Sequence, residues 1–128
     1  MRVQELELAA PKYYKVTLRI YGDEGEWSDV TRILGSDPTH TSNEGGWRYR
    51  PREKWNDVNQ AILTIIDELN GNERSWEVLS KKFNVEFFIG VFAETVNFGI
   101  HLNEHVLCEI AKRKIEVDFD IYCFRHDR

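Results

Sequence analysis

The sequence predicts an α+β fold: a two-layer sandwich with a mainly antiparallel sheet and helices on one face, ferredoxin-like with insertions. Apolar and polar residues alternate in several segments, most clearly 85–93 and 114–124, which indicates β-strands. Between these segments, apolar residues at three- and four-residue intervals indicate amphipathic helices. Because helices would cover the apolar face of the sheet, the aromatic and charged face is expected to be the outer one.

The first half of the chain begins with a strand expected at residues 13–21. A short helix follows over 28–34, with Ser28 as its N-cap and Gly35 as the left-handed residue after it. After an irregular loop, residues 46–50 predict a short edge strand. The apolar side of the first strand comprises Tyr14, Val16, Leu18 and Ile20.

Three longer segments predict further helices: residues 54–69, residues 73–83 with Asn72 as N-cap, and a segment that starts at an Asn103 cap and ends near Lys112. Each has one apolar side, which is expected to face the sheet. The residues on these sides are Trp55, Val58, Ile62, Ile65, Ile66 and Leu69 in the first, Trp76, Leu79 and Phe83 in the second, and Val106, Leu107, Ile110 and Ala111 in the third.

Residues 85–102 form the most apolar stretch and predict a β-hairpin that turns at Thr95-Val96. Its buried face would comprise Val85, Phe87, Ile89, Val91, Ala93, Phe98, Ile100 and Leu102. Its other face would carry Phe88, Gly90, Phe92, Gly99 and His101. That second face is either covered by another part of the chain or by a second subunit, or it is a shallow aromatic groove for a ligand.

The last strand, residues 114–124, is expected to point one set of side chains into the core: Ile115, Val117, Phe119, Ile121 and Cys123. The other set faces outward: Glu116, Asp118, Asp120, Tyr122 and Phe124. The acidic row on this strand would either receive a cation or a basic partner, or serve as a solvated face whose like charges oppose edge aggregation.

The 128 residues fit one domain at 12–124, between an N-terminal tail at 1–11 and a C-terminal tail at 125–128. The net charge of −5 makes nucleic acid an unexpected partner, since a basic footprint is lacking. The N-terminus has glutamates where a signal peptide needs an apolar run, and no stretch has the length of a membrane span. A cytoplasmic protein that does not contact membranes is therefore expected.

Catalytic and metal-binding motifs are not recognisable. His101 and His105 fall on a strand and on the following helix, so the helical spacing of a zinc site does not apply. Neither a phosphate-binding glycine loop nor a nucleophile elbow occurs. Cys108 and Cys123 are too few for a disulfide framework and are expected to be reduced thiols that behave as small apolar residues. We therefore expect no cofactor, no metal and no catalytic residue.

Two regions supply candidate residues for binding a ligand or partner. In the loop at 36–50, aromatic residues alternate with arginines, a pattern that can grip an anionic or planar ligand. Alternatively, Trp47 docks into the core and the arginines balance acidic neighbours. The full candidate set is His40, Trp47, Arg48, Tyr49 and Arg50 from the loop, with Phe88, Phe92, His101 and Tyr122 from the outer face of the sheet.

Short motifs resemble a known family. Residues 31–35 (TRILG) followed by Pro38, the Gly-Gly-Trp at 45–47, and the closing DFDIY at 118–122 are similar to the bacterial domain of unknown function 4279 family. The resemblance extends from about Tyr14 to Tyr122. It implies the same fold and a bacterial cytoplasmic setting, and it carries over no activity and no catalytic residue.

The sequence favours a non-enzymatic protein-binding module, such as an immunity-like inhibitor, because the chain is acidic and lacks catalytic motifs. The alternative is a small-molecule or anion-binding protein, or a minor hydrolase, that uses the loop at 36–50 together with His101. A third hypothesis is a homodimer whose interface is the outer face of the sheet.

Overall fold

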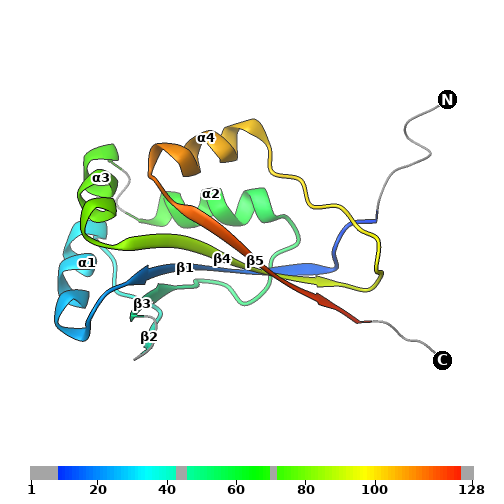
Figure 1. The fold of residues 1–128 in the computed structure, drawn as a ribbon, viewed down its shortest axis with the longest axis horizontal. Coiled ribbons are helices and arrows are strands. Elements are labelled where there is room, and N and C mark those ends of the chain that lie inside the picture. The colour runs from blue at the N-terminus through cyan, green and yellow to red at the C-terminus, as the bar shows by residue number, and fades with distance from the viewer. Residues whose placement is uncertain (1–8, 43–45, 70–71, 125–128) are drawn as a thin grey trace.

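The computed structural model describes residues 9–42, 46–69 and 72–124 and shows one five-stranded sheet with helices packed mainly on one side (Figure 1). This confirms the predicted α+β layout of a mainly antiparallel sheet. Most of the predicted N-terminal tail and the whole C-terminal tail lie outside the described residues. The elements are β1 (Tyr13–Tyr21), the 3-10 turn η2 (Glu24–Glu26), α1 (Trp27–Leu34), β2 (His40–Ser42), β3 (Gly46–Tyr49), α2 (Val58–Glu68), α3 (Glu73–Lys82), β4 (Asn84–Ala93), α4 (Glu104–Lys112) and β5 (Glu116–Cys123).

The strands lie in the order β2-β3-β1-β4-β5, so the two longest strands, β1 and β4, form the centre of the sheet. Neighbours are antiparallel except β4 and β5, which run parallel. In Figure 1, α2 and α4 lie above the strands, whereas α1 and α3 gather at the end of the sheet where β1 finishes. One face of the central strands is thus covered by helices, and we call it the covered face.

The core forms between the covered face and the helices. Alternate residues of the two central strands are at most 5% exposed, as the alternating pattern predicts. They are Tyr14, Val16, Leu18 and Ile20 from β1 and Val85, Phe87, Ile89, Val91 and Ala93 from β4. Trp47 of β3 and Trp76 of α3 are fully buried beside them.

The predicted hairpin is wrong in its second half. Residues 98–102 form no strand; Phe98 makes only an isolated bridge to Ala9. Both edges of β4 are already occupied, by β1 on one side and β5 on the other. The chain after β4 instead crosses over to α4, as a connection between parallel strands must. The apolar residues of this crossover still pack against the core, half-buried: Phe98, Ile100 and Leu102.

The prediction for the last strand is right for its first half only. Ile115 is buried and Val117 is half-buried, but Phe119 and Ile121 are 42% and 54% exposed. In Figure 1, β5 runs out beyond the layer formed by α2 and α4, so its later residues have no helix above them. Cys123 is exposed for the same reason. Cys108, which lies on α4, is exposed as well, so both cysteines are free thiols and neither belongs to the core.

The helix caps agree with the sequence more closely than the helix starts do. Asn72 and Asn103 accept backbone hydrogen bonds as N-caps, and Gly35 adopts φ 69° after α1. However, the predicted N-cap of α1 is wrong: the helix begins at Trp27, the N-cap position is Glu26, and Ser28 lies inside the helix. On the last predicted helix, Leu107 and Ala111 point outward while Val106 and Ile110 are buried.

α2 begins at Val58, capped by Asp57, instead of at residue 54. Trp55 lies outside the helix because its backbone exchanges hydrogen bonds of 2.8 and 2.9 Å with Tyr14 of β1. β3 is not an edge strand, since β2, which the sequence does not reveal, pairs along its outer side. The φ of 79° at Gly46 brings the β3 backbone close to β1: a Cβ there would lie 2.8 Å from the carbonyl oxygen of Ile20.

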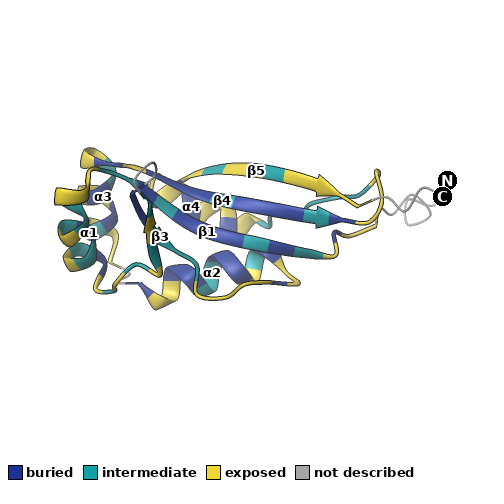
Figure 2. Cartoon of the chain, turned by 90° about the horizontal axis from the view of Figure 1, so that it is seen from below, coloured by how far each residue is buried: buried dark blue, intermediate teal, exposed yellow. Residues whose placement is uncertain are grey.

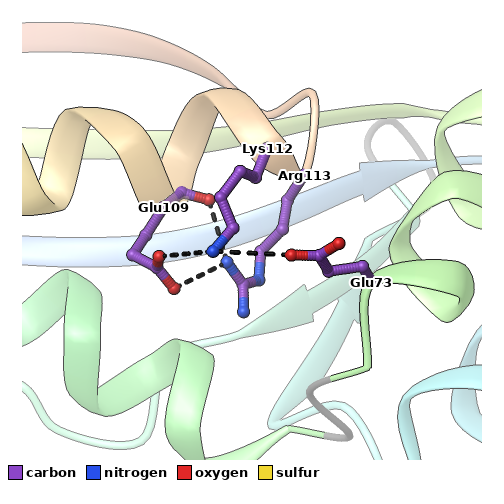
Figure 3. Close-up of polar contacts among 4 residues, drawn as sticks. All are labelled: Glu73, Glu109, Lys112 and Arg113. Carbon is purple, nitrogen blue, oxygen red and sulfur yellow. Dashed lines mark hydrogen bonds and ion pairs between the residues drawn. The ribbon is translucent and has the colours of Figure 1, made fainter.

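Charged side chains join α4 to α3 at the end of α4 (Figure 3). Arg113, only 6% exposed, pairs with Glu109 at 3.0 Å and lies 5.8 Å from the centre of the Trp76 ring. Lys112 bridges Glu109 at 2.9 Å and Glu73 of α3 at 3.5 Å. This cluster contributes to the packing of the helices and lies away from the outer face of the sheet.

Candidate functional site

The face of the sheet opposite the helices is the candidate site, and we call it the open face. Seen from below in Figure 2, β1, β4 and β5 lie at the front and no helix passes before them. The side chains on this face come from alternate positions: Tyr13, Lys15, Thr17 and Arg19 of β1, Glu86, Phe88, Gly90 and Phe92 of β4, Glu116, Asp118, Asp120 and Tyr122 of β5, Arg48 of β3 and His40 of β2.

A hollow of about 220 Å³ opens at the centre of the open face, and we call it the basic hollow. It combines four cationic side chains with a histidine, three aromatic rings and one carboxylate. Its lining residues are Lys15, Thr17, Arg19, His40, Arg48, Arg50, Phe88, Gly90, Phe92, Asp120 and Tyr122.

The hollow exists because β4 carries a glycine between two phenylalanines. Gly90 pairs with Lys15 of β1 and with Asp120 of β5, and it has no side chain to fill the space above it. A Cβ built on Gly90 would lie 3.1 Å from a ring carbon of Phe92 and 3.7 Å from the Cβ of Lys15. A larger side chain here would therefore occupy the hollow itself.

One row of paired residues crosses all five strands and changes from basic to acidic along its length. His40 pairs with Arg48, Arg48 with Arg19, Arg19 with Glu86, and Glu86 with Glu116. The two arginines are thus direct cross-strand neighbours, an arrangement of like charges that destabilises a sheet unless an anion compensates it. The sheet therefore has a basic side at β2, β3 and β1 and an acidic side at β5.

The existing ion pairs compensate the basic side only partly. Glu53, whose side chain is 67% exposed, lies 3.7 Å from Lys15 and 3.9 Å from Arg50. The guanidinium of Arg19 lies 3.6 Å from the centre of the Phe88 ring and donates to the Tyr21 hydroxyl. Within the described part of the chain, Arg48 has no carboxylate within 4.0 Å.

Burial and the positive charge of the hollow both favour the neutral ring of His40. Its pKa lies below the ordinary value of 6.5, first because burial disfavours the charged ring and then because Arg50, Arg48 and Arg19 repel it. His40 is therefore neutral at pH 7. Its Nδ1 lies 3.1 Å from the Thr39 hydroxyl, which also hydrogen-bonds to the carbonyl of Arg48 at 3.3 Å.

On the acidic side, burial and hydrogen bonds raise the pKa values of two groups, Glu86 and Tyr122, and so favour their protonated forms. Burial raises the pKa of the Glu86 carboxyl, and a hydrogen bond with Asp118 raises it further, while Tyr21 and Arg19 lower it. Asp120 accepts a hydrogen bond from the Tyr122 hydroxyl, which raises the pKa of that tyrosine. Asp120 is thus already engaged where it borders the hollow.

A stack of aromatic rings forms one end of the hollow, and we call it the aromatic ridge. Tyr13, Phe92 and Tyr122 are paired in one row, and their ring centres lie 4.6 and 4.8 Å apart with nearly parallel planes. Phe124 follows at 5.9 Å from Phe92. The Phe92 ring is thus stacked against two tyrosines, and the Nζ of Lys15 lies 5.4 Å from its centre.

The structure brings six of the nine predicted candidates together around the basic hollow: His40, Arg48, Arg50, Phe88, Phe92 and Tyr122. The other three lie elsewhere. Trp47 is fully buried on the covered face and donates its ring N–H to Thr31 at 3.0 Å, so it docks in the core. Tyr49 donates to Glu68 of α2 at 2.8 Å. His101 is exposed in the crossover, where its carbonyl accepts from Asn59.

Sequence reasoning missed five residues of the hollow: Lys15, Thr17, Arg19, Gly90 and Asp120. The alternation did indicate that these positions face outward. It did not indicate that β3 would pair beside β1, which is what brings Arg48 next to Arg19.

Comparison with known proteins gives a family but no activity. The family model described as Domain of unknown function (DUF4279) matches residues 11–124. No curated protein and no solved structure matches the chain. In the part of the chain that the structure describes, no helix has the length and apolar character needed to cross a bilayer. Nor do the described residues contain a group of three or more His, Cys, Asp and Glu side chains that could hold a metal ion.

Proposed function

Because the chain belongs to the family named for the domain of unknown function (DUF4279), which brings no activity with it, we propose a function from the site itself. The protein is a non-enzymatic binding module that holds an anionic group of its ligand in the basic hollow. It acts in the cytoplasm, a setting in keeping with two exposed, free thiols, Cys108 and Cys123.

The observation that carries the proposal is the pairing of Arg48 with Arg19 at the mouth of a hollow that also contains Lys15 and Arg50. Facing arginines repel each other, so an anion between them removes a repulsion as well as adding an attraction. Guanidinium groups also offer paired N–H donors that match carboxylate and phosphate oxygens. The protein as a whole carries a net charge of −5, yet the lining of the hollow is positive. The local positive charge of the hollow therefore attracts anionic ligands.

A hydrolase using the same loop has weaker support. The hydroxyl nearest to His40 belongs to Thr39, and it is engaged with the Arg48 carbonyl and accepts from the Arg50 backbone N–H at 2.8 Å. Nucleophilic catalysis needs a hydroxyl that gives its proton to the base and points to the substrate. Binding without turnover is the simpler use of this arrangement.

The test is titration with inorganic phosphate and with succinate, followed by amide NMR shifts and by thermal unfolding. We expect both anions to shift the amide signals of Thr17 and Gly90 and to raise the midpoint of unfolding. Arg48→Gln should weaken binding at least tenfold. The matched control is Arg32→Gln, since Arg32 lies on α1 and already pairs with Asp29 at 2.7 Å.

A second variant tests whether binding needs the open space of the hollow, as distinct from its charge. Gly90→Val fills the space beside Phe92 while leaving every cationic side chain in place, and it should also abolish the phosphate-induced shift of the Thr17 amide. Equal loss of binding in Arg48→Gln and Arg32→Gln, or no shift at Thr17 with either anion, would refute the proposal.

A further inference from the structure

We propose that the ligand is a short, acidic, extended peptide segment of a partner protein, which lies along the strands of the open face from the basic hollow across the aromatic ridge. This inference rests on the proposed function and adds the class of ligand. It follows from a second hollow, from the length of the face, and from the way the ridge is built.

The second hollow, of about 540 Å³, lies on the far side of the aromatic ridge. Tyr13 and Phe124 of the ridge form its near wall, just as Phe92 and Tyr122 form the wall of the basic hollow. The residues that line it are Lys12, Tyr13, Lys54, Asn56, Glu94 and Phe124. One stack of rings thus separates two adjoining hollows.

Positive charge flanks the ridge on both sides. Lys54 places its Nζ 4.6 Å from the centre of the Tyr13 ring, and Lys15 places its Nζ 5.4 Å from the centre of the Phe92 ring. The second hollow has two lysines. Lys12 is paired with Glu94 at 3.7 Å, whereas the contact of Lys54 is with the Tyr13 ring. A ligand with acidic groups at its two ends and an apolar centre would match this order of charges.

The face is too long for a compact anion. The row that contains Arg19 and the row that contains Tyr13 are six residues apart on β1, about 20 Å at the usual rise of a strand. An extended peptide of about six residues spans that length. A phosphate or a small dicarboxylate would occupy the basic hollow and leave the ridge and the second hollow empty.

The ridge suits apolar side chains better than a flat aromatic ligand. The Phe92 ring is already stacked against Tyr13 and Tyr122, so it is less available for stacking with a planar ligand. The outer rings are nonetheless accessible: Tyr122 and Phe124 are each 45% exposed. An aliphatic or aromatic side chain of a peptide can bury this surface, while the main chain continues over the ridge.

The test compares capped peptides by isothermal titration at low salt. The main probe is a hexapeptide with two glutamates at each end and leucine–phenylalanine in the middle. Its matched controls are the same peptide with two serines in the middle and a capped diglutamate. We expect the main probe to bind at least tenfold more tightly than either control, because only it engages both hollows and the ridge.

Variants separate the second hollow from the first. Lys54→Gln should weaken the main probe by threefold or more and leave the binding of phosphate unchanged. Phe124→Ser should also weaken the main probe by threefold or more, because Phe124 belongs to the ridge and lines the second hollow. Lys81→Gln is the matched control, since Lys81 lies on α3 and pairs with Glu77. Both test residues are exposed near the end of the sheet, so folding should survive the change.

The outcomes distinguish the two proposals. Phosphate binding that depends on Arg48, together with equal affinity for the hexapeptide and the diglutamate, would overturn the peptide inference and leave the proposed function intact. Tighter binding of a six-nucleotide oligouridylate than of the hexapeptide would also overturn it. If neither phosphate nor diglutamate binds, both proposals fail.

Discussion

The two faces of the same two strands differ in almost every respect. On the covered face, residues such as Val16 and Ile89 are fully buried beneath helices. On the open face, their neighbours Lys15 and Phe88 are half-buried and border a hollow. Adjacent residues in the chain therefore have different surroundings, and the difference teaches that this fold sets burial residue by residue along its central strands.

The division is physically reasonable. Charged groups brought together without partners are costly, and in the interior that cost would exceed the stability of a small domain. On the open face Arg19 and Arg48 are only half-buried, so two cationic side chains can occupy paired positions there. A change on the open face should thus alter binding, and a change on the covered face should alter folding. Four predictions sharpen or break this comparison.

The largest effect is expected from truncating neighbouring phenylalanines of β4. Phe87→Ala should lower the free energy of unfolding by about 3–5 kcal/mol, because it leaves a cavity in the fully buried core. Phe88→Ala, on the open face, should cost less than half as much. Urea denaturation of both variants provides the measurement. Equal costs would mean that the open face is part of the core.

The next effect compares adjacent residues of β3. Trp47→Phe should cost about 1–3 kcal/mol of unfolding free energy, since it removes buried ring volume and leaves the Thr31 hydroxyl without its donor. Arg48→Gln should change the free energy of unfolding by about 0.5 kcal/mol or less while weakening phosphate binding at least tenfold. A stable Trp47→Phe protein that no longer binds phosphate would reverse the assignment of the two faces.

The third prediction concerns Glu86, the acidic member of the row that crosses the sheet. Because its pKa is raised above the ordinary 4.5, the folded chain binds this proton more tightly than the unfolded chain. The fold therefore loses stability through this group as the pH rises from about 4.5 through the folded-state pKa. Glu86→Gln should remove that loss, so its stability relative to the wild type should increase over this pH range.

Thermal unfolding between pH 4 and pH 8 measures this difference. The comparison variant is Glu94→Gln, which removes a carboxylate whose side chain is 53% exposed. A curve for Glu86→Gln that runs parallel to the wild-type curve would show that burial does not penalise the Glu86 carboxylate.

The smallest expected effect is the titration of His40. Its lowered pKa means that the fold loses stability as the pH falls below about 6.5. An anion in the basic hollow offsets the repulsion from Arg48 and Arg50, so phosphate should raise the pKa of His40 toward its ordinary value. NMR titration of the ring protons with and without phosphate measures the change. The ring signals of His101, which lies in the crossover, should not respond to phosphate.

Much of the candidate site was present in the sequence as separate pieces. The alternation in β4 indicated correctly that Phe88 and Phe92 share a face, and the arginines at 48 and 50, which were predicted as binding candidates, both line the basic hollow. The same local pattern could not show that Trp47 and Tyr49, which alternate with those arginines, lie outside the hollow. Whether a residue of a short strand turns toward core or solvent depends on which strand it pairs with, and here β1 decides that.

By itself, the sequence determined the features that arise within a few residues of chain. These are the alternation of buried and outward side chains in β1 and β4, the asparagine caps of α3 and α4, and the left-handed end of α1 at Gly35. Each depends on the local backbone conformation and on hydrogen bonds between near neighbours, so the residue types alone specify it.

Only the tertiary structure decided which strands are neighbours. It placed β1 and β5 on the two edges of β4 in place of a hairpin, ended the helix layer before the last residues of β5, and set Arg48 beside Arg19. Strand pairing joins segments that are far apart in the chain, and any apolar strand can pair equally well with several others. The choice is made by how the helices and strands pack together as a whole, and no single segment contains that information.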